Sequence, residues 1–252
     1  MTFDYQSQVW GSDQVRLAPT CLEAFKLRRC LADLGKVQDR VLEVGCGAGG
    51  MSKAIRFYRP DLKIIALDVS QAAITHAQKD SQGVKFLVAT ANELPFKKDS
   101  FSAVVLFDVL EHLPDPPLVL TEVSRILKPG GLLHLFVPLE AQPGTFYWLL
   151  KNLGWPGKTL AGHLHRFDCR QLQSLAAKTN YQVVNWQYAH HWLYQLIDLV
   201  HYWAWTKIDQ RPIKKKSLSW LKQLLAPFTN LETTILSRVP GGGVSLTLIN
   251  RS

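Results

Sequence analysis

The chain has 252 residues, of which 47% are hydrophobic and 19% charged, and its formal net charge is +9. This composition excludes a generally disordered chain and is typical of one large α/β domain, with or without an insertion. The positive charge leaves three classes open: a basic enzyme, a protein of anionic membrane surfaces and a nucleic-acid-binding protein.

The cysteines and the lack of long apolar runs bear on where the protein works. Cys21, Cys30, Cys46 and Cys169 form no Cys-x-x-Cys pair and no His/Cys ligand spacing, so we expect no metal site. A reducing, cytoplasmic environment is the simplest expectation for them. Residues 1–17 lack the pattern of a signal peptide, and no stretch of about 18 residues is apolar enough to span a membrane.

The first elements surround a glycine-rich loop. Helical spacing predicts a helix over residues 20–34, and an apolar run predicts a strand over residues 40–44. The strand runs into glycines that allow a sharp turn and close approach to a ligand, namely Gly45, Gly47 and Gly49. A helix over residues 49–57 and a strand over residues 63–67 follow. Asp68 then lies about 20 residues beyond the loop, where a carboxylate would bind ribose hydroxyls.

Strands and helices continue to alternate beyond Asp68. The elements expected next are a helix over residues 71–78, strands over residues 84–88 and 102–107, a helix over residues 116–127 and a strand over residues 132–137. Ser70 is expected to cap its helix, and residues 129–131, Pro-Gly-Gly, are expected to turn into the strand that follows. The alternation predicts a Rossmann-like, doubly wound sheet of seven strands, mostly parallel.

The last third of the chain is less regular. Residues 144–158 are aromatic and glycine-rich and are predicted to form a lid or loop over the site. A helix starting at Asp168 or Cys169 and ending at 178, a strand over residues 181–187 and a final strand over residues 244–250 complete the pattern. The predicted organisation is one domain, residues 1–252, with an N-terminal helical or lid segment (1–36), a cofactor-binding core (37–188), a helical insertion (189–240) and a final strand (241–252).

Several motifs follow one another in a recognisable order. They are Glu-Val-Gly-Cys-Gly-Ala-Gly at 43–49, Asn-Glu-Leu-Pro-Phe at 92–96, the apolar run at 101–108, Glu-His-Leu at 111–113 and Ile-Leu-Lys-Pro-Gly-Gly at 126–131. This series resembles the class I S-adenosylmethionine-dependent methyltransferases, in particular their small-molecule, type-11-like branch, over residues 37–185. The glycine spacing by itself also fits an NAD(P)-dependent oxidoreductase, which remains the alternative.

The resemblance implies S-adenosyl-L-methionine as the cofactor. In that family pattern the loop lies along the methionine part, Asp68 binds the ribose, Val69 packs on the adenine and Asn92 borders its edge. The residues implied in cofactor binding are Glu43, Gly45, Cys46, Gly47, Gly49, Asp68, Val69, Ala91, Asn92, Phe107 and Asp108.

The candidate substrate residues lie after two later strands. The run Gly-His-Leu-His-Arg-Phe at 162–167 contains His163 and His165, and either imidazole could accept a proton from a hydroxyl nucleophile. Arg166 could hold a carboxylate or phosphate, and His112 could contact the substrate. The alternative is that these residues only stabilise their loops through hydrogen bonds.

The predicted insertion combines aromatic and basic residues. Its tryptophans are Trp192, Trp203, Trp205 and Trp220, and Trp186 lies just before it. Its basic residues are Lys207, Arg211, Lys214, Lys215, Lys216 and Lys222. This combination is typical of helices at an anionic bilayer. The alternative is a helical cap over an apolar substrate cavity, with the lysines in a solvated loop. Nucleic acid is an unlikely partner because no base-reading module is recognisable.

Together these features predict methyl transfer to a small, apolar or amphipathic acceptor in a cytoplasmic enzyme, with peripheral membrane contact left open. Oxygen is the first expectation for the acceptor atom because histidines are at hand, and carbon or nitrogen remains open. A non-catalytic, membrane-associated relative is the alternative from a different class of protein.

Overall fold

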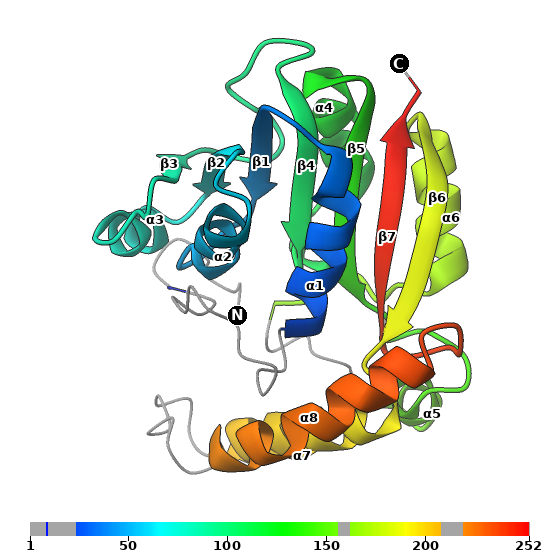
Figure 1. The fold of residues 1–252 in the computed structure, drawn as a ribbon. Helices are drawn as coiled ribbons and strands as arrows, with labels where there is room; N and C mark the ends of the chain where they lie inside the picture. Colours follow the sequence, from blue (N-terminus) through cyan, green and yellow to red (C-terminus); the bar gives the residue numbers. More distant parts are fainter. Residues whose placement is uncertain (1–8, 10–23, 156–161, 208–218, 252) are drawn as a thin grey trace.

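A computed structural model describes residue 9 and residues 24–155, 162–207 and 219–251, without the side chains of residues 201–207 and 219–223. Its seven-stranded sheet has the order β3-β2-β1-β4-β5-β7-β6 (Figure 1). The strands are β1 (Arg40–Val44), β2 (Lys63–Asp68), β3 (Lys85–Val88), β4 (Phe101–Phe107), β5 (Leu127–Pro138), β6 (Tyr181–Ala189) and β7 (Gly243–Asn250). Strand β7 runs antiparallel to β5 and β6, whereas the other strand pairs are parallel, so the predicted fold class is confirmed.

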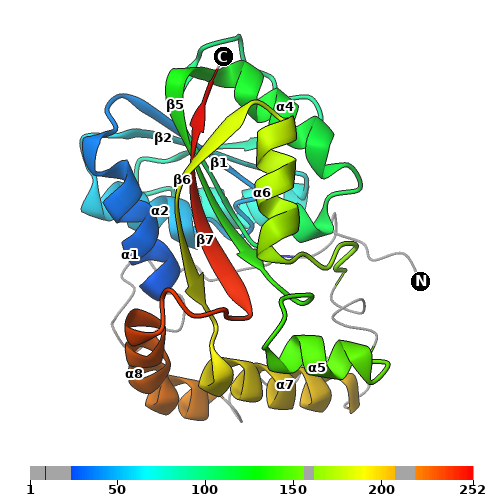
Figure 2. The same ribbon diagram turned by 90° about the vertical axis from the view of Figure 1, so that its right-hand side faces the viewer.

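Helices cover both faces of the sheet. On one face lie α1 (Ala24–Asp33), α2 (Gly50–Tyr58) and α3 (Gln71–Gln78), and on the other lie α4 (Pro116–Ile126) and α6 (Cys169–Lys178) (Figures 1 and 2). Two short 3-10 turns, η1 (Leu34–Lys36) and η2 (Leu110–His112), follow α1 and β4. Beyond the carboxyl ends of β4 and β5 lie α5 (Phe146–Asn152), α7 (Trp192–Lys207) and α8 (Ser219–Ile235).

The sheet has an apolar core on each face, because successive side chains of its central strands point to opposite faces. In β1, Leu42 and Val44 join the core that includes Val119 of α4, whereas Val41 joins the core that includes Phe25 of α1. Successive strand residues point to opposite faces, so a strand covered by helices on both sides must be apolar throughout. Glu43 is the polar exception, and it points to the face of Val41 because both occupy odd positions in β1.

The centre of the sheet is a topological switch point. The chain leaves β1 toward β2 on one side, whereas β4 pairs with β1 on the other side in parallel register, with Val44 opposite Leu106. Crevices outside the carboxyl ends of such strands are where open α/β sheets bind ligands. The fold therefore places the glycine loop after β1 beside the residues that follow β4.

Most predicted elements agree with the structure to within a few residues, and the predicted Ser70 cap is present. Ser70 Oγ accepts a hydrogen bond of 3.1 Å from the Ala73 amide, as expected for the helix that it begins. Asp168 forms a capping box with Gln171 at the start of α6. These signals are local in sequence, which is why they could be recognised without tertiary information.

Two predictions are wrong in detail. Residues 146–152 of the expected lid or loop form the helix α5. Thr145 caps the start of this helix, because its Oγ1 accepts a hydrogen bond from the Trp148 amide. Residues 156–158 of the expected loop lie outside the described part.

The second correction concerns β5, which begins at Leu127 rather than at residue 132. Leu127 already pairs with Phe101, and a register shift before Ala103 accommodates the expected Pro-Gly-Gly turn inside the strand.

Among the described residues, no helix is long and apolar enough to cross a membrane.

Candidate active site

The glycine loop after β1 is fixed by backbone contacts. The amides of Gly45 and Cys46 both donate to the Leu67 carbonyl at the end of β2, at 2.8 and 3.0 Å. Gly45 has a φ of 75°, and a Cβ there would lie 2.5 Å from Val109, just after β4. Only glycine combines this backbone conformation with such close packing. The loop therefore lies directly against the segment that follows β4.

Asp68 connects the loop to the helix α3. Its Oδ2 accepts a hydrogen bond of 2.8 Å from the Gly47 amide, and its Oδ1 accepts one of 2.9 Å from the Ser70 amide. An ionised carboxylate offers about four acceptor positions, so two remain for the hydroxyls of a ribose. The carboxylate is thereby held at the carboxyl edge of the sheet, as the family pattern requires.

Glu43 lies beneath the loop and is almost completely buried. It accepts a hydrogen bond from the Ser52 hydroxyl of α2. Burial raises the pKa of Glu43 to about 8, the Ser52 hydrogen bond lowers it, and the nearby Asp68 charge raises it further. Burial also raises the pKa of the Cys46 thiol, so Cys46 contributes its backbone rather than a reactive thiolate.

The remaining predicted cofactor residues lie along the same edge. Val69 follows β2 with its side chain 45% exposed, and Asn92 is exposed after β3, with Ala91 half-buried beside it. An exposed apolar side chain, a carboxylate and a glycine loop provide surfaces suited to an adenine ring, a ribose and an amino-acid chain. These residues therefore fit the groups of S-adenosylmethionine.

The two residues at the end of β4 differ in their surroundings. Phe107 is nearly buried against the sheet. Asp108 has a φ of 53°, and its carboxylate pairs with Lys26 of α1, which is itself buried. Asp108 also lines a pocket.

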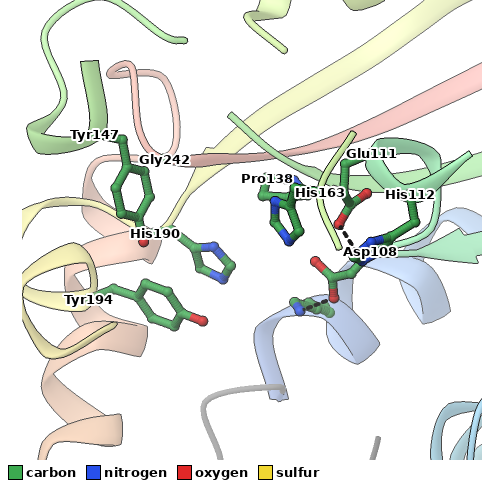
Figure 3. Close-up of a pocket in the computed structure, with 10 residues that line it drawn as sticks. Asp108, Glu111, His112, Pro138, Tyr147, His163, His190, Tyr194 and Gly242 are labelled. Atoms are coloured by element: carbon green, nitrogen blue, oxygen red, sulfur yellow. Dashed lines mark hydrogen bonds and ion pairs between the residues drawn. The ribbon is translucent and has the colours of Figure 1, made fainter. Parts of the chain in front are cut away.

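That pocket has a volume of about 200 Å³ and lies beyond the carboxyl ends of β4 and β5. It is lined by Lys26, Asp108, Glu111, His112, Pro138, Tyr147, His163, His190, Tyr194 and Gly242. Figure 3 shows two groups facing each other across it: an imidazole–carboxylate cluster on one side and Tyr147, His190 and Tyr194 on the other. One wall is therefore ionisable and the other aromatic.

The imidazole–carboxylate cluster consists of Glu111, His112 and His163. His112 Nδ1 lies 3.1 Å from the Gly162 carbonyl oxygen, and the rings of His112 and His163 meet edge to face at 4.8 Å. His163 Nδ1 in turn lies 2.6 Å from Glu140 Oε1. Burial, reinforced by His163, lowers the pKa of His112 to about 4, so this imidazole stays neutral near pH 7. Burial, with the Asp108 charge, raises the pKa of Glu111 well above its ordinary value.

The structure separates the two histidines of the 162–167 run. His163 lines the pocket, whereas His165 does not: its Nε2 lies 3.0 Å from the Leu113 carbonyl oxygen and its ring stacks on Phe167. Arg166 donates to the Trp155 carbonyl at 3.4 Å and is also absent from the lining. The roles predicted for His165 and Arg166 thus have no geometric support in the described residues.

Sequence reasoning missed several pocket residues, namely Lys26, Tyr147, His190, Tyr194 and the adjacent Glu140. They come from α1, α5, α7 and loops between elements, which only tertiary packing brings together. A partial signal was present in Asp108-Val-Leu-Glu111-His112, where acidic groups and a histidine follow directly on an apolar strand. No such local signal marks Lys26.

Comparison with known proteins gives the same family. Residues 42–135 match the model of a methyltransferase domain. A ubiquinone biosynthesis O-methyltransferase of Xanthomonas oryzae pv. oryzae is 32% identical over 163 residues, which are 63% of this chain and 67% of that protein.

Solved structures of similar fold include a putative sarcosine dimethylglycine methyltransferase from Galdieria sulphuraria, at 18% identity and a TM-score of 0.61, covering 96% of this chain and 94% of that one. Another is Haemonchus contortus phosphoethanolamine N-methyltransferase 2 in complex with S-adenosyl-L-methionine, at 17% identity and a TM-score of 0.60, covering 90% and 52%. These likenesses concern the fold alone.

The chain belongs to the class I S-adenosylmethionine-dependent methyltransferases. Its cofactor is S-adenosylmethionine, so the alternative of an NAD(P)-dependent oxidoreductase is rejected. The individual residues assigned to the cofactor remain predictions that the site geometry accommodates.

Asp68→Ala is expected to weaken S-adenosylhomocysteine binding by well over tenfold, because each hydrogen bond to an ionised acceptor contributes roughly 1.5–3 kcal/mol. Asp68→Asn should give an intermediate loss, since one carbonyl acceptor remains. Isothermal titration calorimetry measures both, with the exposed Asp80→Ala as the matched control. An unchanged dissociation constant for a folded Asp68→Ala protein would remove Asp68 from the cofactor site.

The raised pKa of Glu43 predicts that the stability of the folded protein depends on pH. Its folded-state pKa of about 8 exceeds the ordinary value of 4.5, so between these pH values the folded protein binds a proton that the unfolded chain has lost. Stability therefore falls as pH rises, by up to about 1.4 kcal/mol per pH unit. Glu43→Gln, which can still accept from Ser52, should lack this component. Urea unfolding at pH 5.5, 6.5 and 7.5 measures it, and parallel pH profiles for the two proteins would contradict the assignment.

Proposed function

We propose that the protein transfers the methyl group of S-adenosylmethionine to a hydroxyl oxygen of a small amphipathic molecule bound in the pocket. The observation that carries this proposal is the imidazole–carboxylate cluster, which lines the pocket. Two of its members, Glu111 and His112, follow closely after Val109, which packs against Gly45 of the glycine loop. The relative from Xanthomonas oryzae is named as an O-methyltransferase of ubiquinone biosynthesis, which supports oxygen as the acceptor atom.

The reaction needs alignment more than strong chemical activation. The cofactor, when bound, supplies a methyl group on a positively charged sulfur. The acceptor oxygen would attack the methyl carbon in line with the carbon–sulfur bond and displace the sulfur. The glycine loop and Asp68 would hold the donor at the carboxyl ends of β1 and β2. The imidazole–carboxylate cluster would hold the acceptor hydroxyl at the end of β4 and favour loss of its proton.

The opposite wall of the pocket suits a flat, partly apolar acceptor. His190 stacks on Tyr194 with ring centroids 3.6 Å apart and an interplanar angle of 3°. Tyr147 is buried next to them, and its hydroxyl donates a hydrogen bond of 2.6 Å to Asp198. Aromatic faces bind planar rings well. An aromatic ring bearing a hydroxyl would therefore place the ring on this wall and the hydroxyl toward the cluster.

The acceptor could be presented by a membrane surface. The helix α7 exposes a stripe at helical spacing, Trp192, Leu196 and Val200, and α8 exposes a second stripe, Leu224, Phe228, Leu231 and Ile235. Both stripes border the basic stretch at 207–222 of the sequence. Exposed apolar residues beside lysines favour contact with an anionic bilayer, and we propose a cytoplasmic enzyme with such peripheral contact. The described cysteines Cys30, Cys46 and Cys169 are free, in keeping with a reducing compartment.

The proposed reaction can be tested with labelled S-adenosylmethionine and a set of alkyl-substituted phenols, anilines and thiophenols. The expected product carries its methyl group on oxygen, as identified by mass spectrometry. His163→Ala should lower turnover by about a hundredfold or more, because a group that positions the acceptor hydroxyl and assists loss of its proton contributes about 10²–10⁴-fold. Its affinity for S-adenosylhomocysteine should stay near that of the wild type.

His165→Ala is the matched control, since His165 lies two residues away and outside the pocket lining. It should retain activity within a few-fold. Methylation of nitrogen or sulfur alone, or full turnover by His163→Ala between pH 6 and 9, would refute the assignment of the cluster to an oxygen acceptor.

Membrane contact predicts a loss of liposome binding when Lys214, Lys215 and Lys216 are changed together to Gln. Each lysine near an anionic surface contributes about 1 kcal/mol, so affinity should fall about a hundredfold at low salt. Co-sedimentation with phosphatidylserine-containing vesicles measures it. The control changes three exposed lysines elsewhere, Lys79, Lys97 and Lys98, and should bind like the wild type. If the wild-type protein does not bind these vesicles at low salt, the proposed membrane contact is wrong. The helices α7 and α8 would then be interpreted as a cap over the pocket.

A further inference from the structure

The carboxylate of Glu111 is the least explained polar group of the pocket. Its side chain is 1% exposed, and neither of its oxygens has a hydrogen-bond partner among the described residues. The cation Lys26 at this pocket pairs with Asp108. A buried carboxyl group without hydrogen bonds is energetically unfavourable even when it is protonated, and a ligand or a cation would complete its surroundings. Figure 3 shows Glu111 on the same wall of the pocket as His112 and His163.

Three potential ligand atoms converge at this point. One donor atom from each of Glu111, His112 and His163 lies within 4.8 Å of the others. Glu111 Oε1 lies 3.7 Å from His112 Nε2, a separation that a shared cation can bridge. The three residues come from η2 and from the 162–167 run, and the amides of Leu164 and His165 donate to the Glu111 carbonyl at 2.9 and 3.1 Å. The two segments are therefore fixed against each other.

The outer contact of His112 matches that of a metal-binding histidine, and a carboxylate lies beside the ring of His163. His112 Nδ1 faces the Gly162 carbonyl at 3.1 Å, and His163 Nδ1 faces Glu140 Oε1 at 2.6 Å. The carbonyl against His112 Nδ1 keeps the proton there and leaves Nε2 as the electron-pair donor, whereas the contact of His163 with Glu140 is an ion-pair distance without hydrogen-bond geometry. Such outer contacts orient the ring and raise its basicity as a ligand.

We propose that Glu111, His112 and His163 bind one divalent transition-metal ion at the wall of the acceptor pocket. Two imidazoles and one carboxylate suit ions of the manganese-to-zinc series, whereas Mg²⁺ and Ca²⁺ prefer sets of oxygen ligands. Three protein ligands leave coordination positions open toward the pocket.

The role of the ion rests on the proposed oxygen acceptor. At an open position it would bind the acceptor hydroxyl oxygen, and the O–H bond would break with the electron pair left on oxygen and the proton passing to water. That oxygen would then form its bond to the methyl carbon as the carbon–sulfur bond of the donor breaks. Metal binding itself does not depend on this role.

The test uses the full chain without an affinity tag, stripped with a chelator and titrated with Co²⁺, with Zn²⁺ in competition and Mg²⁺ for comparison. Calorimetry and visible absorption should report one Co²⁺ per chain, displaced by Zn²⁺. Glu111→Gln and His163→Ala should each weaken Co²⁺ binding by more than tenfold, whereas His165→Ala should bind like the wild type. Unchanged binding of S-adenosylhomocysteine shows that the variants are folded. The same Co²⁺ affinity in wild type and Glu111→Gln, or no Co²⁺ binding by the wild type, would overturn the metal site.

Methyl transfer measured with and without chelator separates this inference from the proposed function. Binding of one Co²⁺ through Glu111 without methylation of any hydroxyl acceptor would support the metal site and contradict the oxygen acceptor. Full turnover in chelator by a protein that binds no metal would support the reaction and contradict the metal site.

Discussion

The parallel pairing of β1 with β4 is the constraint on which the rest of the site depends. Because Val44 lies opposite Leu106, the chain leaves both strands at the same level of the sheet. The glycine loop after β1 and the segment after β4 then meet, closely enough that a Cβ at Gly45 would lie 2.5 Å from Val109. In the proposed reaction, this contact would place the donor beside the acceptor.

Buried ionisable groups gather where these two strands end. Glu43 lies under the loop, Lys26 pairs with Asp108, and Glu111 faces the pocket, each of them almost completely buried except Asp108. Burying charges disfavours folding unless they are paired, protonated or bound to a ligand. The rest of the sheet offsets this with strands that are apolar on both faces. Glu111 and His112 both line the pocket and have shifted pKa values, and such groups gathered in one pocket are typical of functional sites rather than of structural cores.

The sequence predicts the half of the fold that depends on local signals. Three features can be recognised from a few neighbouring residues, and the structure has them as expected: the glycine loop, Asp68 at the end of β2 and the Ser70 cap. The helix α5 was missed because its aromatic run resembles a loop and its cap, Thr145, is not followed by a recognisable amphipathic pattern. The proposed metal ligands show the same limit, since Glu111 and His163 are separated in sequence by α4, β5 and α5 and lie together only in the folded chain.

The account is tested most directly by a crystal structure of the protein with S-adenosylhomocysteine. The predicted result has the ribose hydroxyls on Asp68, the adenine on Val69 and the sulfur atom directed at the pocket that holds Glu111 and His163. A bound molecule whose sulfur atom faces away from that pocket, or whose ribose lies elsewhere than at Asp68, would contradict the central claim that donor and acceptor meet where β1 and β4 end.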